Sequence, residues 1–319
     1  MTKINLPQEE LTIRNEYGKV LAELGASHPD LVVLDADLSG STKTSTFCKT
    51  YPERFFNCGV AEQNMIGIAG GLAVSGKIVF ASTFAMFATG RPWDMIRNTI
   101  AYPRLNVKIA ATHGGLSVGP DGASHQALED IALMRVIPQM QVFVPADGYE
   151  VRSIVRYAAD NHGPTYIRMC RPGSKTVYTS EPEFTPGKAT ILAEGTDVSL
   201  IACGLMTRLA LEAAQELLGQ GISAQVVNMA SIKPLDTDLL IKLAQTGRPL
   251  VTIEEHSIIG GLGSAVAETV CEVAPAIVKR LGTANVFGES GSQSELFEKH
   301  GLTVQRITQA AQEAVRQKG

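Results

Sequence analysis

The chain has 319 residues, of which 45% are apolar and 19% charged, and its formal net charge is -4. This length fits two domains of about 100–200 residues each, and this composition is typical of globular proteins and not of disordered ones. The acidic balance leaves no basic surplus to neutralise a phosphate backbone, which argues against nucleic acid as the main partner. No apolar run approaches the roughly 20 residues of a membrane span, and the first residues, MTKINLPQEE, include no apolar segment of signal-peptide type.

The cysteines indicate a reducing compartment. They are odd in number, five in all, and no C-x-x-C pair occurs. We therefore expect buried free thiols in a cytoplasmic protein, without a disulfide framework or a zinc site. The five are Cys48, Cys58, Cys170, Cys203 and Cys271.

Apolar runs and segments with helical spacing alternate along the first half of the chain. Near-continuous apolar character predicts buried parallel strands at 31–37, 77–82, 106–112, 140–145 and 164–169. Helical periodicity predicts helices at 12–26, 62–75, 84–100, 127–136 and 148–160. This alternation predicts an α/β domain with a doubly wound, mostly parallel sheet.

A polar stretch rich in proline and glycine, residues 172–188, interrupts the pattern. We assign residues 1–175 to a first domain, 176–188 to a linker and 189–319 to a smaller second domain. The same alternation predicts that the second domain is also α/β, with a mostly parallel sheet. Its predicted strands are 197–203, 224–229 and 249–255, and its predicted helices are 206–219, 236–245 and one after Gly263.

Several common ligand motifs are absent: the chain has no G-x-x-x-x-G-K-[ST], no G-x-G-x-x-G and no H-E-x-x-H. The GGLG run at 260–263 precedes a predicted helix. Such glycines either form an ordinary turn or open a helix N-terminus toward an anion.

The segment FFNCGVAEQNMIGIAGGLA (55–73) places Glu62 in the first turn of a helix, at the carboxyl end of a predicted strand. Ligands bind at that edge of open α/β sheets. Two interpretations follow. Glu62 complements the helix dipole, or it is a carboxylate of raised pKa that protonates a ring nitrogen.

The segment FASTFAMFATGRPWDMIR (80–97) places Phe84 and Phe87 three residues apart on a predicted helix. They are either a core aromatic pair or a stacking platform for a planar heterocycle, which Arg91 would then cap. The segment ATHGGLSVGPDGASHQALED (111–130) forms a glycine-rich loop holding His113, Ser117, Asp121 and His125. Such a loop suits the wall of an active site. The mixed spacing of its ligand-type residues argues against a metal site.

Together, GVAEQNM, STFAMF and THGG…GPDGASHQ closely resemble the pyrimidine-binding half of transketolases. IACG (201–204), IKPLD (232–236) and IEEH (253–256) extend the resemblance over essentially the whole chain. No GDG occurs, although transketolases use a GDG…N segment of an N-terminal domain to bind the diphosphate and metal of thiamine diphosphate. The chain therefore resembles the C-terminal subunit of a split transketolase.

This resemblance implies the following roles. Glu62 hydrogen-bonds the pyrimidine N1′ of the cofactor, and His125 is the second catalytic residue, near the hydroxyls of the donor ketose. The cofactor-binding positions are Asp37, Glu62, Phe84, Phe87 and Arg91. The substrate positions, of which Asp121 contacts the acceptor hydroxyl, are Arg14, Ser41, His113, Asp121, His125 and Arg171. In many members a tyrosine lies one turn after the second phenylalanine, whereas this chain has Gly90 followed by Arg91 at that place.

The resemblance also implies partners. We expect thiamine diphosphate, Mg²⁺ (or Ca²⁺) held mainly by an N-terminal subunit with the GDG motif, sugar-phosphate substrates and a two-fold assembly with two copies of each subunit. No metal ligands are assigned to this chain. Rival interpretations are the β subunit of a 2-oxo acid dehydrogenase, a fragment of a deoxyxylulose-phosphate synthase, a split enzyme for a sulfo- or branched sugar, and a regulatory or scaffold module.

Overall fold

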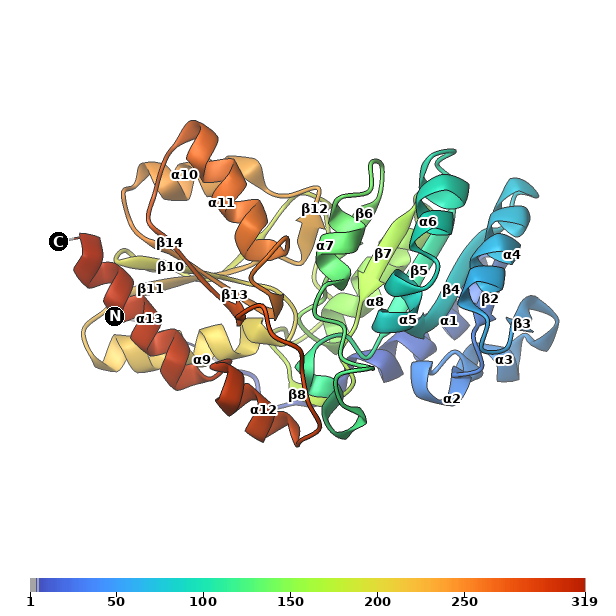
Figure 1. The fold of residues 1–319 in the computed structure, drawn as a ribbon, viewed down its shortest axis with the longest axis horizontal. Helices are drawn as coiled ribbons and strands as arrows, with labels where there is room; N and C mark the ends of the chain where they lie inside the picture. Colours follow the sequence, from blue (N-terminus) through green and yellow to red (C-terminus); the bar gives the residue numbers. More distant parts are fainter. Residues whose placement is uncertain (1–3, 5, 319) are drawn as a thin grey trace.

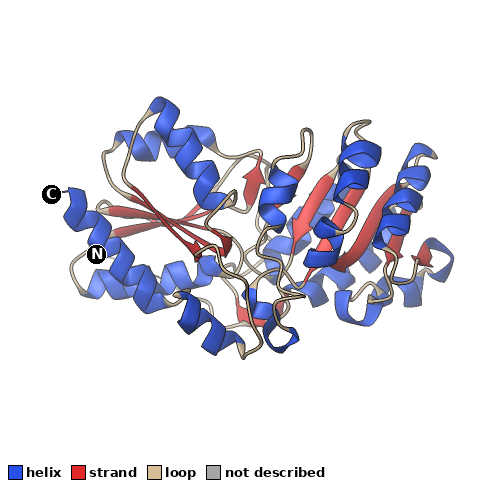
Figure 2. Ribbon diagram, in the orientation of Figure 1, coloured by secondary structure: helices blue, strands red, loops and turns tan. Residues whose placement is uncertain are grey.

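The computed structural model describes residues 4 and 6–318 and contains two α/β units that pack side by side (Figure 1). Figure 2 shows each unit as a sheet with helices on both faces, as the sequence predicts. The outermost residues of the two expected domains, 1–3 and 319, lie outside the described residues. In the part of the chain that the structure describes, no helix combines the length and the apolar character needed to span a bilayer.

The first unit is built on a seven-stranded sheet with the order β12-β6-β7-β5-β4-β2-β3. All neighbours are parallel except β12, which runs antiparallel to β6. The strands are β2 (Leu31–Asp35), β3 (Phe55–Asn57), β4 (Ile78–Phe84), β5 (Val107–Thr112), β6 (Gln141–Phe143), β7 (Thr165–Arg168) and β12 (Ser231–Lys233).

Alternate residues of this sheet enter two separate cores. Phe80 of β4 packs with α1 (Ile13–Ser27), α3 (Ser45–Thr50) and α8 (Gly148–Asp160) on one face. Its neighbours in β4 pack on the other face with α4 (Glu62–Val74), α5 (Ala85–Gly90), η2 (Ile96–Ala101) and α7 (Asp130–Arg135). Because side chains alternate across a strand, continuous apolar runs fill both cores and both faces are covered.

The second unit is built on a five-stranded sheet with the order β14-β13-β10-β11-β9, in which only β9 is antiparallel. Its helices α9 and α13 share a core on one face, and α10 and α11 share a core on the other. Its strands are β9 (Thr190–Ala193), β10 (Val198–Ala202), β11 (Ala224–Asn228), β13 (Leu250–Ser257) and β14 (Val278–Thr283). Its helices are α9 (Met206–Gly219), α10 (Thr237–Gln245), α11 (Leu262–Val273), α12 (Gln293–His300) and α13 (Val304–Lys318).

The connection between the units differs in part from the sequence pattern. Residues 176–188 contain no helix or strand, but Gly173–Lys175 forms β8, which pairs antiparallel with β1 (Glu10–Thr12). β12, which follows β11 in the chain, joins the sheet of the first unit instead of the second. Three-residue strands at a sheet edge carry too little periodicity to be predicted.

Three other expectations need correction. The single helix predicted at 84–100 is divided into α5, α6 (Trp93–Met95) and η2, because Phe84 ends β4 and Pro92 lacks the N–H that a continuous helix needs. The helix placed after Gly263 begins at Leu262. The cysteines are free, but Cys271 is exposed on the outer side of α11, and Cys48 and Cys58 are half-buried.

Candidate functional site

The candidate residues of the first unit gather at one edge of its sheet. Asp37 follows β2, Glu62 follows β3, Phe84 ends β4, His113 follows β5, and Arg171 follows β7. These strands are parallel, so their carboxyl ends meet at the same edge, where open α/β sheets bind ligands.

Glu62 begins α4, and its side chain is 3% exposed. Both of its carboxylate oxygens lie 2.7 Å from Nη1 of Arg91, which is 46% exposed. The carbon of the same guanidinium lies 4.2 Å from the ring centroid of Phe87. Glu62 thus lies in the first turn of α4, where a carboxylate complements the helix dipole. It also faces the planar guanidinium of Arg91, which stacks on the ring of Phe87.

The aromatic residues form one cluster with the two histidines of the 111–130 segment. The rings of Phe84 and Phe87 are 5.9 Å apart with 19° between their planes, and His113 stacks on Phe84 at 3.7 Å. His125 meets Phe87 edge-on at 5.1 Å. Phe84 is buried, whereas Phe87 is half-buried and contacts Arg91, so Phe87 is the ring more open to the site.

His113 is held as a neutral imidazole. Its backbone has a φ of 60°, and its Nδ1 lies 2.8 Å from Oγ1 of Thr112. Burial, together with the nearby positive charges of Arg14 and Arg171, lowers the pKa of His113 to about 3. The neutral ring can therefore donate one hydrogen bond to an anion but adds no positive charge at neutral pH.

Two arginines form a second cluster beside the aromatic one. Arg14 donates from Nε to the carbonyl oxygen of Arg171 at 3.0 Å and from Nη1 to that of Ser41 at 2.8 Å. Arg171 donates to the carbonyl oxygen of Val118 at 2.6 Å and approaches Asp121 at 3.4 Å. Burial, together with the charge of Arg171, lowers the pKa of Arg14. Two close guanidinium groups that bond mainly to carbonyl oxygens make a region suited to a phosphate.

A cavity of about 370 Å³ opens against this cluster. Its lining includes Arg14, Ser117 and Arg171 from the first unit and Gln293 from α12 of the second. Ser41 contacts Arg14 through its carbonyl oxygen, a contact that side-chain reasoning did not predict. Pattern reasoning also missed Asp35, a buried carboxylate at the end of β2 that accepts hydrogen bonds from Thr42 and Thr44 at 2.7 and 2.8 Å.

Asp37 lies apart from both clusters. Its backbone φ is 64°, and its carboxylate and N–H both bond to the side chain of Asn57 at the end of β3. Asp121 is exposed, and His125 is half-buried with Nδ1 2.9 Å from Oγ of Ser124. Within residues 4 and 6–318, no three His, Cys, Asp or Glu side chains converge as a metal-binding group.

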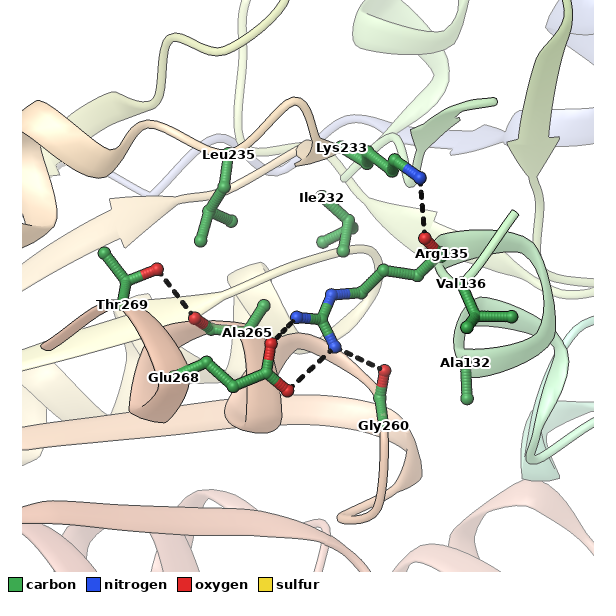
Figure 3. Close-up of a pocket in the computed structure, with 10 residues that line it drawn as sticks. All are labelled: Ala132, Arg135, Val136, Ile232, Lys233, Leu235, Gly260, Ala265, Glu268 and Thr269. Carbon is green, nitrogen blue, oxygen red and sulfur yellow. Dashed lines mark hydrogen bonds and ion pairs between the residues drawn. The ribbon is translucent and has the colours of Figure 1, made fainter. Parts of the chain in front are cut away.

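Figure 3 shows a larger cavity, of about 600 Å³, that lies away from these residues between α7, β12 and α11. Arg135 pairs there with Glu268 and donates to the carbonyl oxygen of Gly260. Lys233 donates to the carbonyl oxygens of Arg135 and Ile137. The charged groups of this cavity already have partners within the protein, and no residue of the aromatic or arginine cluster lines it.

Comparison with known proteins identifies both units. A model of the transketolase pyrimidine-binding domain matches residues 9–175, and a model of the transketolase C-terminal domain matches residues 187–307. A Methanocaldococcus jannaschii protein, named as the C-terminal section of a transketolase, is 51% identical over 95% of this chain and 96% of its own. A 6-deoxy-6-sulfo-D-fructose transketolase subunit from Clostridium sp. (strain MSTE9) is 40% identical over 97% of this chain and 96% of its own.

The solved structures agree. A split-gene transketolase, described as an inactive beta4 tetramer, superposes with a TM-score of 0.91 and 55% sequence identity. The superposition covers 97% of this chain and 100% of that one. Transketolases depend on thiamine diphosphate, and a split transketolase needs an N-terminal partner subunit. The chain belongs to the transketolase family, as the subunit that carries the pyrimidine-binding and C-terminal domains of a split enzyme.

Proposed function

We propose that this chain is part of a cytoplasmic, thiamine-diphosphate-dependent transketolase that transfers a two-carbon ketol unit from a ketose phosphate to an aldose phosphate. It supplies the carboxylate that activates the pyrimidine ring and much of the sugar-phosphate site, and an N-terminal subunit completes the enzyme. One observation carries the proposal: the arrangement of Glu62, Arg91 and Phe87.

The residues of this chain fit an aminopyrimidine. The guanidinium of Arg91 is planar and rich in nitrogen, bonds to both oxygens of Glu62 and lies over the ring of Phe87. A pyrimidine ring that donates to Glu62 from N1′ and stacks on Phe87 would use the same two anchors. Arg91 is 46% exposed and is free to turn outward when a ring occupies them.

Each group of this chain has a distinct task in the reaction. The cofactor, when bound, supplies the carbanion chemistry at its thiazolium C2. Glu62 holds a proton at the pyrimidine nitrogen, because its carboxylate is buried at the start of α4 and both of its oxygens bond to Arg91. His125 exchanges protons with sugar hydroxyls beside Phe87, and Asp121 accepts a hydrogen bond from an acceptor hydroxyl. Asp37 bonds to Asn57 and to neither cluster, so its assignment to the cofactor side rests on the family resemblance alone.

The substrate phosphate fits the cavity at Arg14 and Arg171. Charged hydrogen bonds from two guanidinium groups suit a dianion, and the neutral His113 adds one hydrogen bond. Ser41 orients Arg14 through its carbonyl oxygen. This chain offers no converging acidic ligands among its described residues, so we assign Mg²⁺ (or Ca²⁺) and the diphosphate to the GDG segment of the N-terminal subunit.

The experiment is a ketol-transfer assay of the chain mixed with a GDG-containing partner, thiamine diphosphate and Mg²⁺, with a ketose phosphate as the donor. We expect turnover by the mixture, and quenching of Trp93 fluorescence as cofactor is added, because Trp93 lies two residues from Arg91. Turnover of 2-oxo acids in place of ketose phosphates would instead favour a 2-oxo acid dehydrogenase. Absence of cofactor-dependent quenching would favour a scaffold module.

A second candidate is a ketol transferase for a sulfonated sugar. The relative from Clostridium sp. is named for 6-deoxy-6-sulfo-D-fructose, and two guanidinium groups also suit a sulfonate. The same assay with a 6-sulfo ketose as donor separates the two candidates, since the true donor gives the higher kcat/KM.

A further inference from the structure

The loop from His113 to Ala127, here called the substrate loop, joins the two clusters of the site. Its stems meet where the N–H of Gly115 donates to the carbonyl oxygen of Ala127 at 3.0 Å. Between them the chain passes through η3 (Leu116–Asp121) to His125. The loop has little regular structure of its own, so its shape depends on what it packs against.

The C-terminal domain provides that support. Glu255, on β13, is 3% exposed, and its Oε1 accepts a hydrogen bond from the backbone N–H of Ser117 at 2.5 Å. Gly115 has a φ of 88°, and a Cβ at this position would collide with the carboxylate of Glu255. Glycine at 115 therefore serves both a left-handed backbone and a close approach to this one side chain.

Two further contacts join the same domain to the far side of the loop. Nε2 of Gln126 donates to the carbonyl oxygen of Glu289 at 2.9 Å. A Cβ at Gly122, where φ is 78°, would lie 2.6 Å from Oγ of Ser290. The loop is thus held at its start by Glu255 and at its end by the segment before α12. Figure 1 shows the chain before α12 passing close to this part of the first unit.

Arg168 of β7 holds Glu255 in place. Its Nη2 donates to the backbone carbonyl oxygen of Glu255 at 2.8 Å, and its Nε donates to Asp130 at 2.8 Å. The positive charge of Arg168 also offsets part of the cost of burying the carboxylate of Glu255. Because Arg168 holds the backbone of Glu255, the carboxylate of Glu255 can hold the backbone N–H of Ser117 in one position.

We propose that Glu255 is a positioning residue for ketol transfer: from the C-terminal domain, it fixes the substrate loop through Ser117 so that His125 meets the aromatic cluster and Asp121 lies beside Arg171 of the arginine cluster. The roles of Asp121 and His125 rest on the proposed function, whereas the anchoring of the loop does not. The inference gives the second domain a part in the site of the first.

The test compares two variants of Glu255, one that changes the charge of the side chain and one that changes its length. Glu255→Gln keeps an oxygen at the same distance but removes the charge, and Glu255→Asp keeps the charge but withdraws it by one methylene. If the hydrogen bond to Ser117 positions the loop, Glu255→Asp is the more damaging variant. If Glu255 only neutralises the charge of Arg168, Glu255→Gln is the more damaging variant.

Hydrogen exchange of the peptide covering residues 114–126 in the full chain is the first readout. We expect exchange to rise about tenfold or more in Glu255→Asp and to stay near the wild-type rate in Glu255→Gln. In the mixture with the partner subunit, we expect Glu255→Asp to raise KM for the ketose donor about tenfold while proton exchange at thiazolium C2 stays within about twofold of wild type.

Glu254→Asp is the matched control. Glu254 precedes Glu255 on β13 and is fully buried, but its carboxylate accepts from the N–H groups of Leu262 and Gly263 at the start of α11. It should lower thermal stability without changing exchange in the loop. Gly115→Ala is a second probe of the same contact, should Glu255→Asp fail to fold, and is expected to raise loop exchange likewise.

Three results would overturn the proposal: unchanged loop exchange in both Glu255→Asp and Gly115→Ala, equal loosening by Glu254→Asp, or greater loosening by Glu255→Gln than by Glu255→Asp. The exchange measurement needs no sugar turnover. A failure to find the substrate would therefore count against the proposed function and leave the result on Glu255 intact.

Discussion

Glu62 shows how a buried charge is kept available for chemistry. Its carboxylate is almost inaccessible, yet its partner Arg91 is nearly half exposed and belongs to a different segment of the chain. Removing one partner of a buried ion pair leaves an uncompensated charge, which is costly. A cofactor ring that replaces Arg91 must therefore offer Glu62 a hydrogen-bond donor, and a ring nitrogen that carries a proton does so.

Glu62→Gln is the corresponding prediction. The amide keeps the shape of the side chain but cannot deliver a proton, so we expect the rate of proton exchange at thiazolium C2 to fall by about 10²- to 10⁴-fold in the assembled enzyme. Deuterium exchange at C2 measures this directly. Glu53→Gln removes the same charge from an exposed site and should leave the rate unchanged. A wild-type exchange rate in Glu62→Gln would remove Glu62 from the mechanism.

Arg171→Ala is the prediction for the phosphate cluster. The variant loses charged hydrogen bonds worth about 1.5–3 kcal/mol, so KM for a ketose phosphate should rise about 10- to 100-fold. KM for hydroxypyruvate, which has no phosphate, should change far less. Arg316→Ala, at an exposed position on α13, is the control. Equal losses for both donors would show that Arg171 does not bind the phosphate.

At the scale of elements, α8 links the two domains through a buried acid. Asp147 caps the helix by accepting from the N–H groups of Tyr149 and Glu150. The carboxylate of Glu150 accepts from Asn228 on β11 at 2.7 Å and from the backbone N–H of Ala146 at 2.7 Å. Burial raises the pKa of Glu150 to about 7, although these hydrogen bonds oppose the rise.

This raised pKa predicts a pH-dependent stability. The folded protein binds the proton of Glu150 more tightly than the unfolded chain, so the contribution is full below the ordinary carboxyl pKa near 4.5 and is lost as pH rises through 7. Relative to Glu150→Gln, the wild type should lose up to about 3 kcal/mol of unfolding free energy between pH 4.5 and 8. Chemical denaturation across that range tests it. A difference that does not vary with pH would contradict the raised pKa, and Glu53→Gln controls for loss of a charge.

The sequence leaves open whether the glycine run at 260–263 forms an ordinary turn or opens a helix N-terminus toward an anion. The N–H groups of Leu262 and Gly263, at the start of α11, are directed at an anion, and that anion is the carboxylate of Glu254 from the same domain. The helix N-terminus is therefore satisfied internally. Local sequence predicts the donors, but only the fold identifies their acceptor.

At the scale of the whole molecule, exposed apolar side chains lie on α4 and on the segment before it. The exposed apolar side chains there include Phe56, Val60 and Ile68, which are 41%, 69% and 38% exposed. They lie on β3, on the turn before Glu62 and on α4. We expect the N-terminal subunit to cover them, since obligate interfaces are large and apolar.

The prediction at this scale is that the chain is inactive alone. The proposed site provides anchors for a pyrimidine, but no converging acidic ligands for a metal occur among the described residues. We expect ketol transfer only when both subunits are mixed, and a mass that corresponds to two copies of each subunit with two-fold symmetry. Activity assays and light scattering of each chain and of the mixture test both parts. Substantial turnover by the lone chain with thiamine diphosphate and Mg²⁺ would disprove it.

The α/β class and the place of the candidate site can be predicted from the amino-acid sequence alone. Buried parallel strands need continuous apolar runs, and helices such as α8 and α9 need a periodic apolar face. Both patterns are therefore visible within a short segment of the sequence. Parallel strands share a carboxyl edge, so residues that follow them, such as Glu62 and His113, must meet there. The short strands β8 and β12 and the break at Pro92 escaped prediction, because two or three residues carry no period and because a strong helical pattern around a single proline conceals the interruption.

The pairing of side chains, in contrast, depends on the tertiary structure. Arg91 bonds to Glu62 across 29 positions, Arg14 reaches the carbonyl oxygen of Arg171 across 157, and Glu255 holds Ser117 across 138. No local pattern encodes such distances, because each pairing depends on how the sheets twist and on how the two domains dock. For the same reason, the fold decides which carbonyl oxygens bond to Arg14 and that Glu255 bonds to the substrate loop. The sequence decides only which residue types are present.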